Sequence, residues 1–371
     1  MKKLLFAFLF SLLFTFFGTF LVHAETTNTS TLSTSSVDKY FRGTVMTIVR
    51  DGSNEVGDSF QDLRVHIDSG DLKGGEKEIR VIDSADQKSR VLGLNDKVIV
   101  LQSTDLDGKE SFAVMDLYRF PKVMILLAIF FFIILWVVGR RRGLLSLLAL
   151  GWSVAVLMLF IVPQIAHGAN PFLVSVTGAF FIVIVSIALG HGLNRRTIIA
   201  SVGTLITLVL SVVIAYLSIK FTRSFGMGSE DAQFLLSSPL GEIDLSGVLM
   251  AGIIIGTLGV LDDVTTAQAA AVEEIHFANK SLSVRELYKR GMSVGKEHII
   301  ALVNTLVLAY AGASLPVLLL LSIYVQPIWV TLSSEMIVEE VVRTLSGSVS
   351  LILAVPITTY LAAFVIGSKE K

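Results

Sequence analysis

The chain has 371 residues, of which 53% are hydrophobic, and its mean hydropathy is +0.73. These values lie well above those of a soluble domain and predict a multi-pass membrane protein. The formal net charge of −1 gives no reason to expect nucleic acid as a partner. Because cysteine is absent, disulfides, thiolate metal sites and a cysteine nucleophile are excluded.

Residues 1–24 have the pattern of a signal peptide. Lys2 and Lys3 precede an apolar run over 4–22, and the small residues Val22 and Ala24 precede a cut after Ala24. The apolar run is long for a signal, so an uncleaved anchor is the alternative. Either outcome places the following segment outside the cytoplasm. Residues 25–36 form a Ser/Thr-rich linker.

Residues 37–120 predict a small extracytoplasmic β-barrel. Short runs with period-2 patterning are separated by Gly, Asp and Ser turns, which is typical of about five antiparallel strands. An OB-like or SH3-like barrel is the predicted type. The runs cover 41–49, 60–67, 78–82, 97–102 and 112–118. The segment 105–110 partly imitates a calcium loop, but a hairpin turn is the preferred interpretation because the remaining ligands are missing.

Residues 121–371 predict an all-α membrane bundle of about seven transmembrane helices with an inner loop over 262–297. The apolar spans cover about 122–139, 144–162, 172–190, 198–219, 246–261, 298–321 and 347–366. Pro316 and Pro356 are expected to kink the last two spans, and 334–345 is expected to form an amphipathic helix at the outer interface.

The distribution of basic residues predicts the orientation. If the barrel lies outside, the predicted outer loops hold only Lys220, Arg223 and Arg343, whereas the inner loops hold twelve Lys and Arg residues. This asymmetry indicates a bacterial plasma-membrane protein with a cytoplasmic C-terminus. The inner residues are Arg140, Arg141, Arg142, Arg195, Arg196, Lys280, Arg285, Lys289, Arg290, Lys296, Lys369 and Lys371.

The stretch 251–274 is the most informative part of the chain. An apolar helix with Gly252, Gly256 and Gly259 offers a small surface for helix packing and then reaches two adjacent carboxylates, Asp262 and Asp263. At 3.6 residues per turn, Thr266 and Glu273 share the face of Asp262, whereas Asp263 points about 100° away. We therefore expect only one of the two, Asp262, to point into the bundle.

Other polar residues are expected at the same depth on the inner face. His191 ends the third span, His298 opens the sixth, and Asn304 lies about two turns deeper. With the carboxylates they could bind a divalent cation or relay protons. The alternatives are structural: the aspartates cap the following helix, or the region docks a partner. Convergence of Asp262, His191 and His298 would favour a shared site.

Enzyme signatures are missing from the sequence. It contains no G-x-S-x-G elbow, no H-E-x-x-H and no phosphate-binding loop. An intramembrane aspartyl protease needs two facing aspartates from separate helices, whereas Asp262 and Asp263 are adjacent on one helix. We therefore expect no enzyme activity, no cofactor beyond a bound cation, and no catalytic residue.

The block GTLGVLDDVTTAQAAAVEE at 256–274 resembles the signature of the YibE/F-like membrane proteins of bacteria. The segments GHGLNRR at 190–196 and GKEH at 295–298 are similar too, and the resemblance covers about 122–366. It implies an integral membrane protein of permease type and supplies neither a substrate nor catalytic residues.

These observations favour a secondary transporter, permease or transport accessory that uses the inner-face carboxylates for a cation or proton. A different class of function is the alternative: a non-transporting scaffold that binds proteins through its barrel and inner loop. The expected partners are the lipid bilayer, a cation or proton, and a membrane protein or second copy of the chain.

Overall fold

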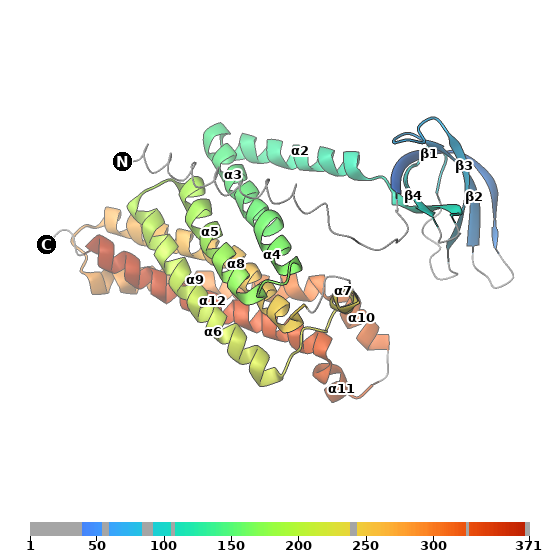
Figure 1. Cartoon of the computed structure of the whole chain (residues 1–371). Coiled ribbons are helices and arrows are strands. Elements are labelled where there is room, and N and C mark those ends of the chain that lie inside the picture. The colour runs from blue at the N-terminus through green and yellow to red at the C-terminus, as the bar shows by residue number, and fades with distance from the viewer. Residues whose placement is uncertain are drawn as a thin grey trace. The chain divides into compact units, whose positions relative to one another are not determined.

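The computed structural model describes residues 39–53, 59–83, 92–104, 108–237, 243–323 and 326–367. The predicted signal and linker lie outside these ranges, as does the C-terminal end of the chain. The described chain divides into two units near residue 136, a β-sheet unit followed by one helix and a helical unit (Figure 1). Each unit is described by itself.

The sheet unit has five antiparallel strands in the regions that the period-2 patterning predicted. They are β1 (Lys39–Ser53), β2 (Ser59–Ile67), β3 (Glu76–Asp83), β4 (Lys97–Thr104) and β5 (Glu110–Leu117). Their order is β3-β2-β1-β4-β5, so the long β1 lies at the centre. Two register shifts against β2, near Val45 and Ile48, interrupt the β1–β2 ladder. Such irregularities bend a strand, and the sheet forms a half-barrel. Closure into an OB-like or SH3-like barrel stays a prediction.

Alternation of side chains builds the core of this sheet. Val45, Leu63, Val65 and Val98 are fully buried on one face, where every second residue points inward. The other face carries ion pairs, for example Arg80 with Asp62 at 2.7 Å. Thr104 pairs with Glu110 in the antiparallel β4–β5 ladder, and the predicted turn falls largely on 105–107, which lie outside the described residues.

A single apolar helix, α2 (Phe120–Val137), follows β5, and none of its residues is buried within the described structure. The helical unit then contains the remaining helices. They are α3 (Arg140–Val156), the π-helical turn η1 (Leu157–Ile161), α4 (Val162–Ala166), α5 (Pro171–His191), α6 (Arg195–Thr222), α7 (Glu230–Leu236), α8 (Leu245–Ala278), α9 (Val284–Ala313), α10 (Leu315–Ile323), α11 (Ile328–Ser333) and α12 (Glu335–Gly367). Within the described ranges, seven helices or helical segments, α2 among them, are long and apolar enough to cross a membrane.

Helices α6, α8 and α12 pack against one another to form the centre of the helical unit, with α5 on α8 and α9 along α12 (Figure 1). Glycines allow close approach at two of these contacts. A Cβ on Gly203 of α6 would lie 2.6 Å from Thr358 Oγ1 of α12, and one on Gly295 of α9 would lie 2.4 Å from Val355 Cγ1. Small residues let membrane helices approach in this way.

Three segments differ from the sequence-based expectations. The predicted inner loop over 262–297 is helical except at 279–283, because α8 continues to Ala278 and α9 starts at Val284. The predicted separate helix over 334–345 is the first part of α12, which continues without a break past Pro356. The sixth span is interrupted at Ser314, where α10 begins with Pro316 in its first turn. Proline is tolerated in that position because the first turn needs no amide donor.

Candidate functional site

Helix α8 carries the acidic pair in its interior. The helix starts at the cap residue Asp244, whose Oδ1 accepts a hydrogen bond from Gly247 N at 3.0 Å, and it runs for 34 residues. Asp262 and Asp263 are therefore not caps of a following helix, and that alternative is wrong. The helix continues past the pair because the segment Val264–Ala271 contains several good helix formers and neither Gly nor Pro.

The two aspartates have different environments. Asp263 is exposed, whereas Asp262 is partly buried and its Oδ1 has no hydrogen-bond partner among the described residues. This difference agrees with the expectation that Asp262 alone points into the bundle. An unpaired buried carboxylate oxygen is costly in a low dielectric, so the position is a candidate for function.

Hydroxyl groups surround the backbone of Asp262. Thr265 Oγ1 lies 3.2 Å from the Asp262 carbonyl oxygen and 2.7 Å from Thr204 Oγ1 of α6. Thr266 donates to the Asp262 carbonyl oxygen at 2.9 Å, so its hydroxyl bonds its own helix. Thr204 in turn donates to the Ala200 carbonyl oxygen at 3.0 Å. The Asp262 carbonyl oxygen therefore lies beside a fully buried α6–α8 hydroxyl contact.

This contact belongs to a larger set of buried hydroxyls between α6, α8 and α12, which we call the hydroxyl row. Its members are Thr204, Thr207 and Ser211 on α6, Thr257 and Thr265 on α8, and Ser346, Ser350, Thr358 and Thr359 on α12. The sequence analysis did not identify it. A signal was present, because Thr197, Thr204 and Ser211 recur every seven residues and so share one face of an apolar span.

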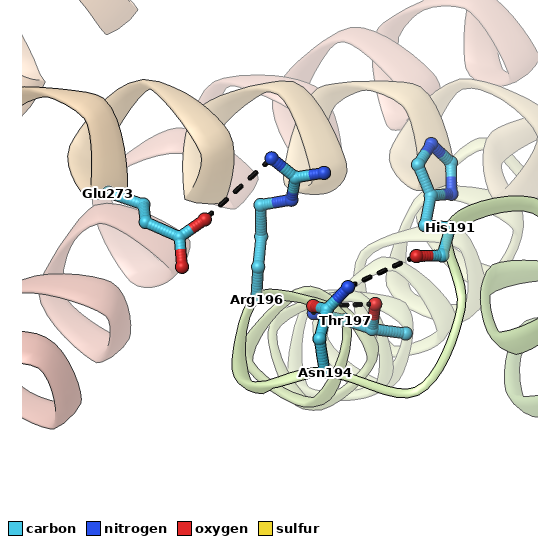
Figure 2. A network of polar contacts seen from close by, with 5 residues as sticks. All are labelled: His191, Asn194, Arg196, Thr197 and Glu273. Atoms are coloured by element: carbon cyan, nitrogen blue, oxygen red, sulfur yellow. Dashed lines mark hydrogen bonds and ion pairs between the residues drawn. The ribbon is translucent and has the colours of Figure 1, made fainter.

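His191 lies at the end of α5 beside α8, as Figure 2 shows. Asn194 holds this turn: its Nδ2 donates to the His191 carbonyl oxygen at 3.1 Å, and its Oδ1 accepts from Thr197 N at 2.9 Å to cap α6. The charge of Asp263 acts on the exposed His191 ring. Asp262 Oδ1 is buried and has no hydrogen-bond partner among the described residues, so the exposed His191 ring is not hydrogen-bonded to it.

Glu273 forms an ion pair with Arg196 of α6 at 3.7 Å (Figure 2). It lies eleven residues beyond Asp262, or about 16 Å along the helix axis. The shared face predicted for the two residues is thus present, but Glu273 ties α8 to α6 instead of contributing to the Asp262 position.

Two further candidates, His298 and Asn304, belong to α9. Helix α9 meets α8 at Gln268, whose Nε2 donates to the Gly291 carbonyl oxygen at 2.9 Å. Gln268 is six residues from Asp262, which places it about 240° around the helix. His298 is partly buried and Asn304 is exposed. Because Asp262 Oδ1 has no hydrogen-bond partner among the described residues, neither residue is hydrogen-bonded to it, and their place in a shared site stays a prediction.

Gln268 is a buried polar residue that sequence reasoning missed. It is fully buried, its Nε2 also donates to Thr359 Oγ1 of α12 at 2.7 Å, and its Oε1 has no partner among the described residues. Gly291 and Gly295 leave room for it, because a Cβ on Gly295 would lie 3.0 Å from Gln268 Nε2. The spacing of these two glycines, four residues apart, was the available signal.

The glycines proposed for helix packing on α8 are exposed within this chain. A Cβ on Gly252 or Gly259 would meet nothing within 4 Å, and one on Gly256 would meet only Tyr310 Oη, at 3.4 Å. Within the described residues, no three His, Asp or Glu side chains come together in a group that could hold a metal ion. The geometry at Asp262 is better suited to a proton than to a divalent cation.

Comparison with known proteins gives one match. A family model described as YibE/F-like protein matches residues 127–368, well over half of the chain and nearly all of the helical unit. Neither a curated protein nor a solved structure matches the chain.

Proposed function

The chain belongs to the YibE/F-like family, and from that premise we propose that it is a proton-coupled secondary transporter in which Asp262 carries the proton. The observation that supports this proposal is the buried Asp262 Oδ1, which has no hydrogen-bond partner in the described chain. A carboxyl group in such a place holds a proton while it is enclosed and releases it when water reaches it. Proton binding is thereby coupled to the packing of α8 against α6.

The hydroxyl row supports the same proposal. Hydroxyls both donate and accept hydrogen bonds, so a row of them can pass a proton or contact a polar solute without a fixed charge. Ser211, Ser346 and Thr358 have hydroxyl oxygens with no partner among the described residues. Thr358 lies at the contact of α12 with α6, beside Gly203, and the proposed polar path runs along this interface.

The proposal includes a membrane orientation. The sheet unit, as a closed OB-like barrel, lies outside the cell after removal of the signal, and the C-terminus lies in the cytoplasm. The basic residues near the ends of α5, α6, α8 and α9 support this orientation through the positive-inside rule. Asp262 then lies towards the inner face. No catalytic chemistry is assigned to the chain.

Charge displacement after a pH jump tests the proton role without knowledge of the solute. Wild-type protein reconstituted on a solid-supported membrane should give a transient current, and Asp262→Asn should abolish it. Asp263→Asn is the matched control, because it removes a neighbouring carboxylate that is exposed; its current should persist. The transported solute can then be sought by adding pools of small solutes under an imposed pH gradient.

Two results would contradict the proposal. A pH-jump current that persists in Asp262→Asn would show that another group carries the proton. If wild-type and both variants give no current while the protein retains its fold and its cellular partners, the non-transporting scaffold becomes the better explanation.

A further inference from the structure

A large cavity lies at the end of the helical unit remote from Asp262. Its volume is about 1110 Å³, and it is an open pocket lined by the N-terminal ends of α5 and α8 and the C-terminal end of α6. Pockets for drug-sized ligands range from about 300 to 1,000 Å³. The cavity is therefore larger than a small inorganic ion requires, and it is separate from the proton site proposed above.

One wall of this cavity is apolar. Val212, Val213, Tyr216 and Leu217 line it from α6, and Met250 lines it from α8. Val213 is 48% exposed and Leu217 is 58% exposed within the chain. An apolar wall of this length, running along a membrane-spanning helix, is suited to an alkyl chain.

Two cations line the same cavity at the last turn of α6. Lys220 and Arg223 are both exposed, and neither forms an ion pair among the described residues. Lys220 Nζ lies 5.6 Å from the centre of the Tyr216 ring, a cation–π distance that holds the ammonium beside the apolar wall. The cavity thus combines an apolar wall with an unneutralised positive end.

The backbone of Arg223 gives a second indication. This residue caps α6 in the left-handed conformation, with φ 56° and ψ 40°. Glycine is the usual residue there, because a side chain disfavours this conformation. Such outliers persist where the surrounding structure uses them. Here the conformation places a guanidinium on the cavity wall.

The carboxylate in the cavity does not neutralise these cations. Asp244 also lines the cavity, but its Oδ1 accepts from Gly247 N at 3.0 Å and caps α8. Asn170 caps α5 in the same way, accepting from Leu173 N at 3.1 Å. Asp244 caps its helix and forms no ion pair with Lys220 or Arg223 among the described residues, so both cations remain available to a ligand.

We propose that this cavity binds an anionic phospholipid, with an acyl chain along the α6 wall and the phosphate between Lys220 and Arg223. Both cations lie at the end of a membrane-spanning helix, which is the depth of lipid headgroups. Arginine and lysine are the side chains that recognise phosphate. A free anion would use the cations but not the apolar wall, whereas a phospholipid uses both.

Titration of delipidated, detergent-solubilised protein with dioleoylphosphatidylglycerol, followed by native mass spectrometry, tests the proposal. Dioleoylphosphatidylcholine and inorganic phosphate serve as comparison ligands. Wild-type protein should bind the phosphatidylglycerol most tightly. The double variant Lys220→Ala/Arg223→Ala should weaken that binding about thirtyfold, as expected for two charges near a membrane surface. Arg285→Ala/Lys289→Ala removes two exposed cations from α9 and should leave binding unchanged.

A second variant tests the apolar wall. Val213→Trp occupies part of the cavity while both cations remain, and it should weaken lipid binding but not change the elution volume of the folded protein. Equal binding of both phospholipids with no effect of Lys220→Ala/Arg223→Ala would overturn the proposal. So would inorganic phosphate binding as tightly as the lipid, because the acyl chain would then contribute nothing.

Discussion

The close packing of α9 against α8 and α12 can be tested with one added methyl group. In Gly295→Ala, the new Cβ would lie 2.4 Å from Val355 Cγ1. It would also lie 3.0 Å from Nε2 and 3.1 Å from Oε1 of Gln268. Overpacking of this kind costs about 1–3 kcal/mol. The control, Gly252→Ala on α8, adds a methyl group that meets nothing within 4 Å.

Both glycines lie inside helices, so each substitution also gains about 1 kcal/mol of helix propensity. The comparison of the two variants cancels this gain. Gly295→Ala should therefore be less stable than Gly252→Ala by about 1–3 kcal/mol, the cost of the overpacking alone. Thermal unfolding of the purified proteins, followed by the loss of monodisperse elution, measures the difference as a lower midpoint for Gly295→Ala.

A second substitution identifies the contact responsible. Val355→Ala removes the methyl group that the new Cβ would meet, so the double variant Gly295→Ala/Val355→Ala should be more stable than the two separate effects predict. Equal midpoints for Gly295→Ala and Gly252→Ala would refute the reasoning, because they would show that α9 does not pack against Val355 at this distance.

Three further predictions concern the core amide, the sheet and the orientation. Gln268→Ala removes two hydrogen bonds and leaves a void, so it should lower the free energy of unfolding by about 2–4 kcal/mol. Gln233→Ala, at an exposed position of α7, should change the unfolding midpoint little. Equal effects of the two substitutions would contradict the buried role of Gln268. In the sheet, the hydrogen bond from Arg80 lowers the pKa of Asp62. This interaction therefore stabilises the sheet at pH values above the unfolded-state pKa of about 3.9. The stabilisation is lost as the pH falls through the folded-state pKa. Backbone hydrogen exchange in β2 and β3 should therefore be faster in Asp62→Asn than in wild type at neutral pH, and the difference between the two proteins should shrink in acid. A difference in exchange rate that stays constant with pH would rule out the ion pair as its cause. Single cysteines introduced in 92–104 or 225–237 should react with an impermeant thiol reagent from outside, and those in 280–290 should not; outside labelling at 280–290 would reverse the proposed orientation.

Local patterns were sufficient to predict the strands and the spans. Alternation with a period of two placed all five strands, because a sheet with one buried face selects side chains at every second position. Apolar length placed the spans for an equally local reason. The angular separation of Asp262 and Asp263 on one helix predicted that the two differ in burial, and they do. The choice of Asp262 relied on close packing at Gly259, which is exposed within the described chain.

The sequence pattern was insufficient where polarity alone was used to end a helix. The two carboxylates set the predicted end of the apolar span and the start of the inner loop, although the residues up to Glu274 were expected to be compatible with a helix. Helix α8 does continue past them, to Ala278, because its backbone hydrogen bonds do not depend on the polarity of the side chains. The same limitation applies to the predicted cluster. His191 and His298 each lie at the predicted inner end of an apolar span. That depth does not determine which face of a neighbouring helix the residue contacts.

The sequence by itself determined the strands, the long apolar helices and the family, since each depends on residues that are near one another in the chain. Only the tertiary structure decided that Thr204 meets Thr265, that Gln268 is enclosed between Gly291 and Thr359, and that a cavity opens beside Lys220. These contacts join helices separated by long stretches of chain. Their partners depend on lateral helix packing, which small residues permit but do not specify.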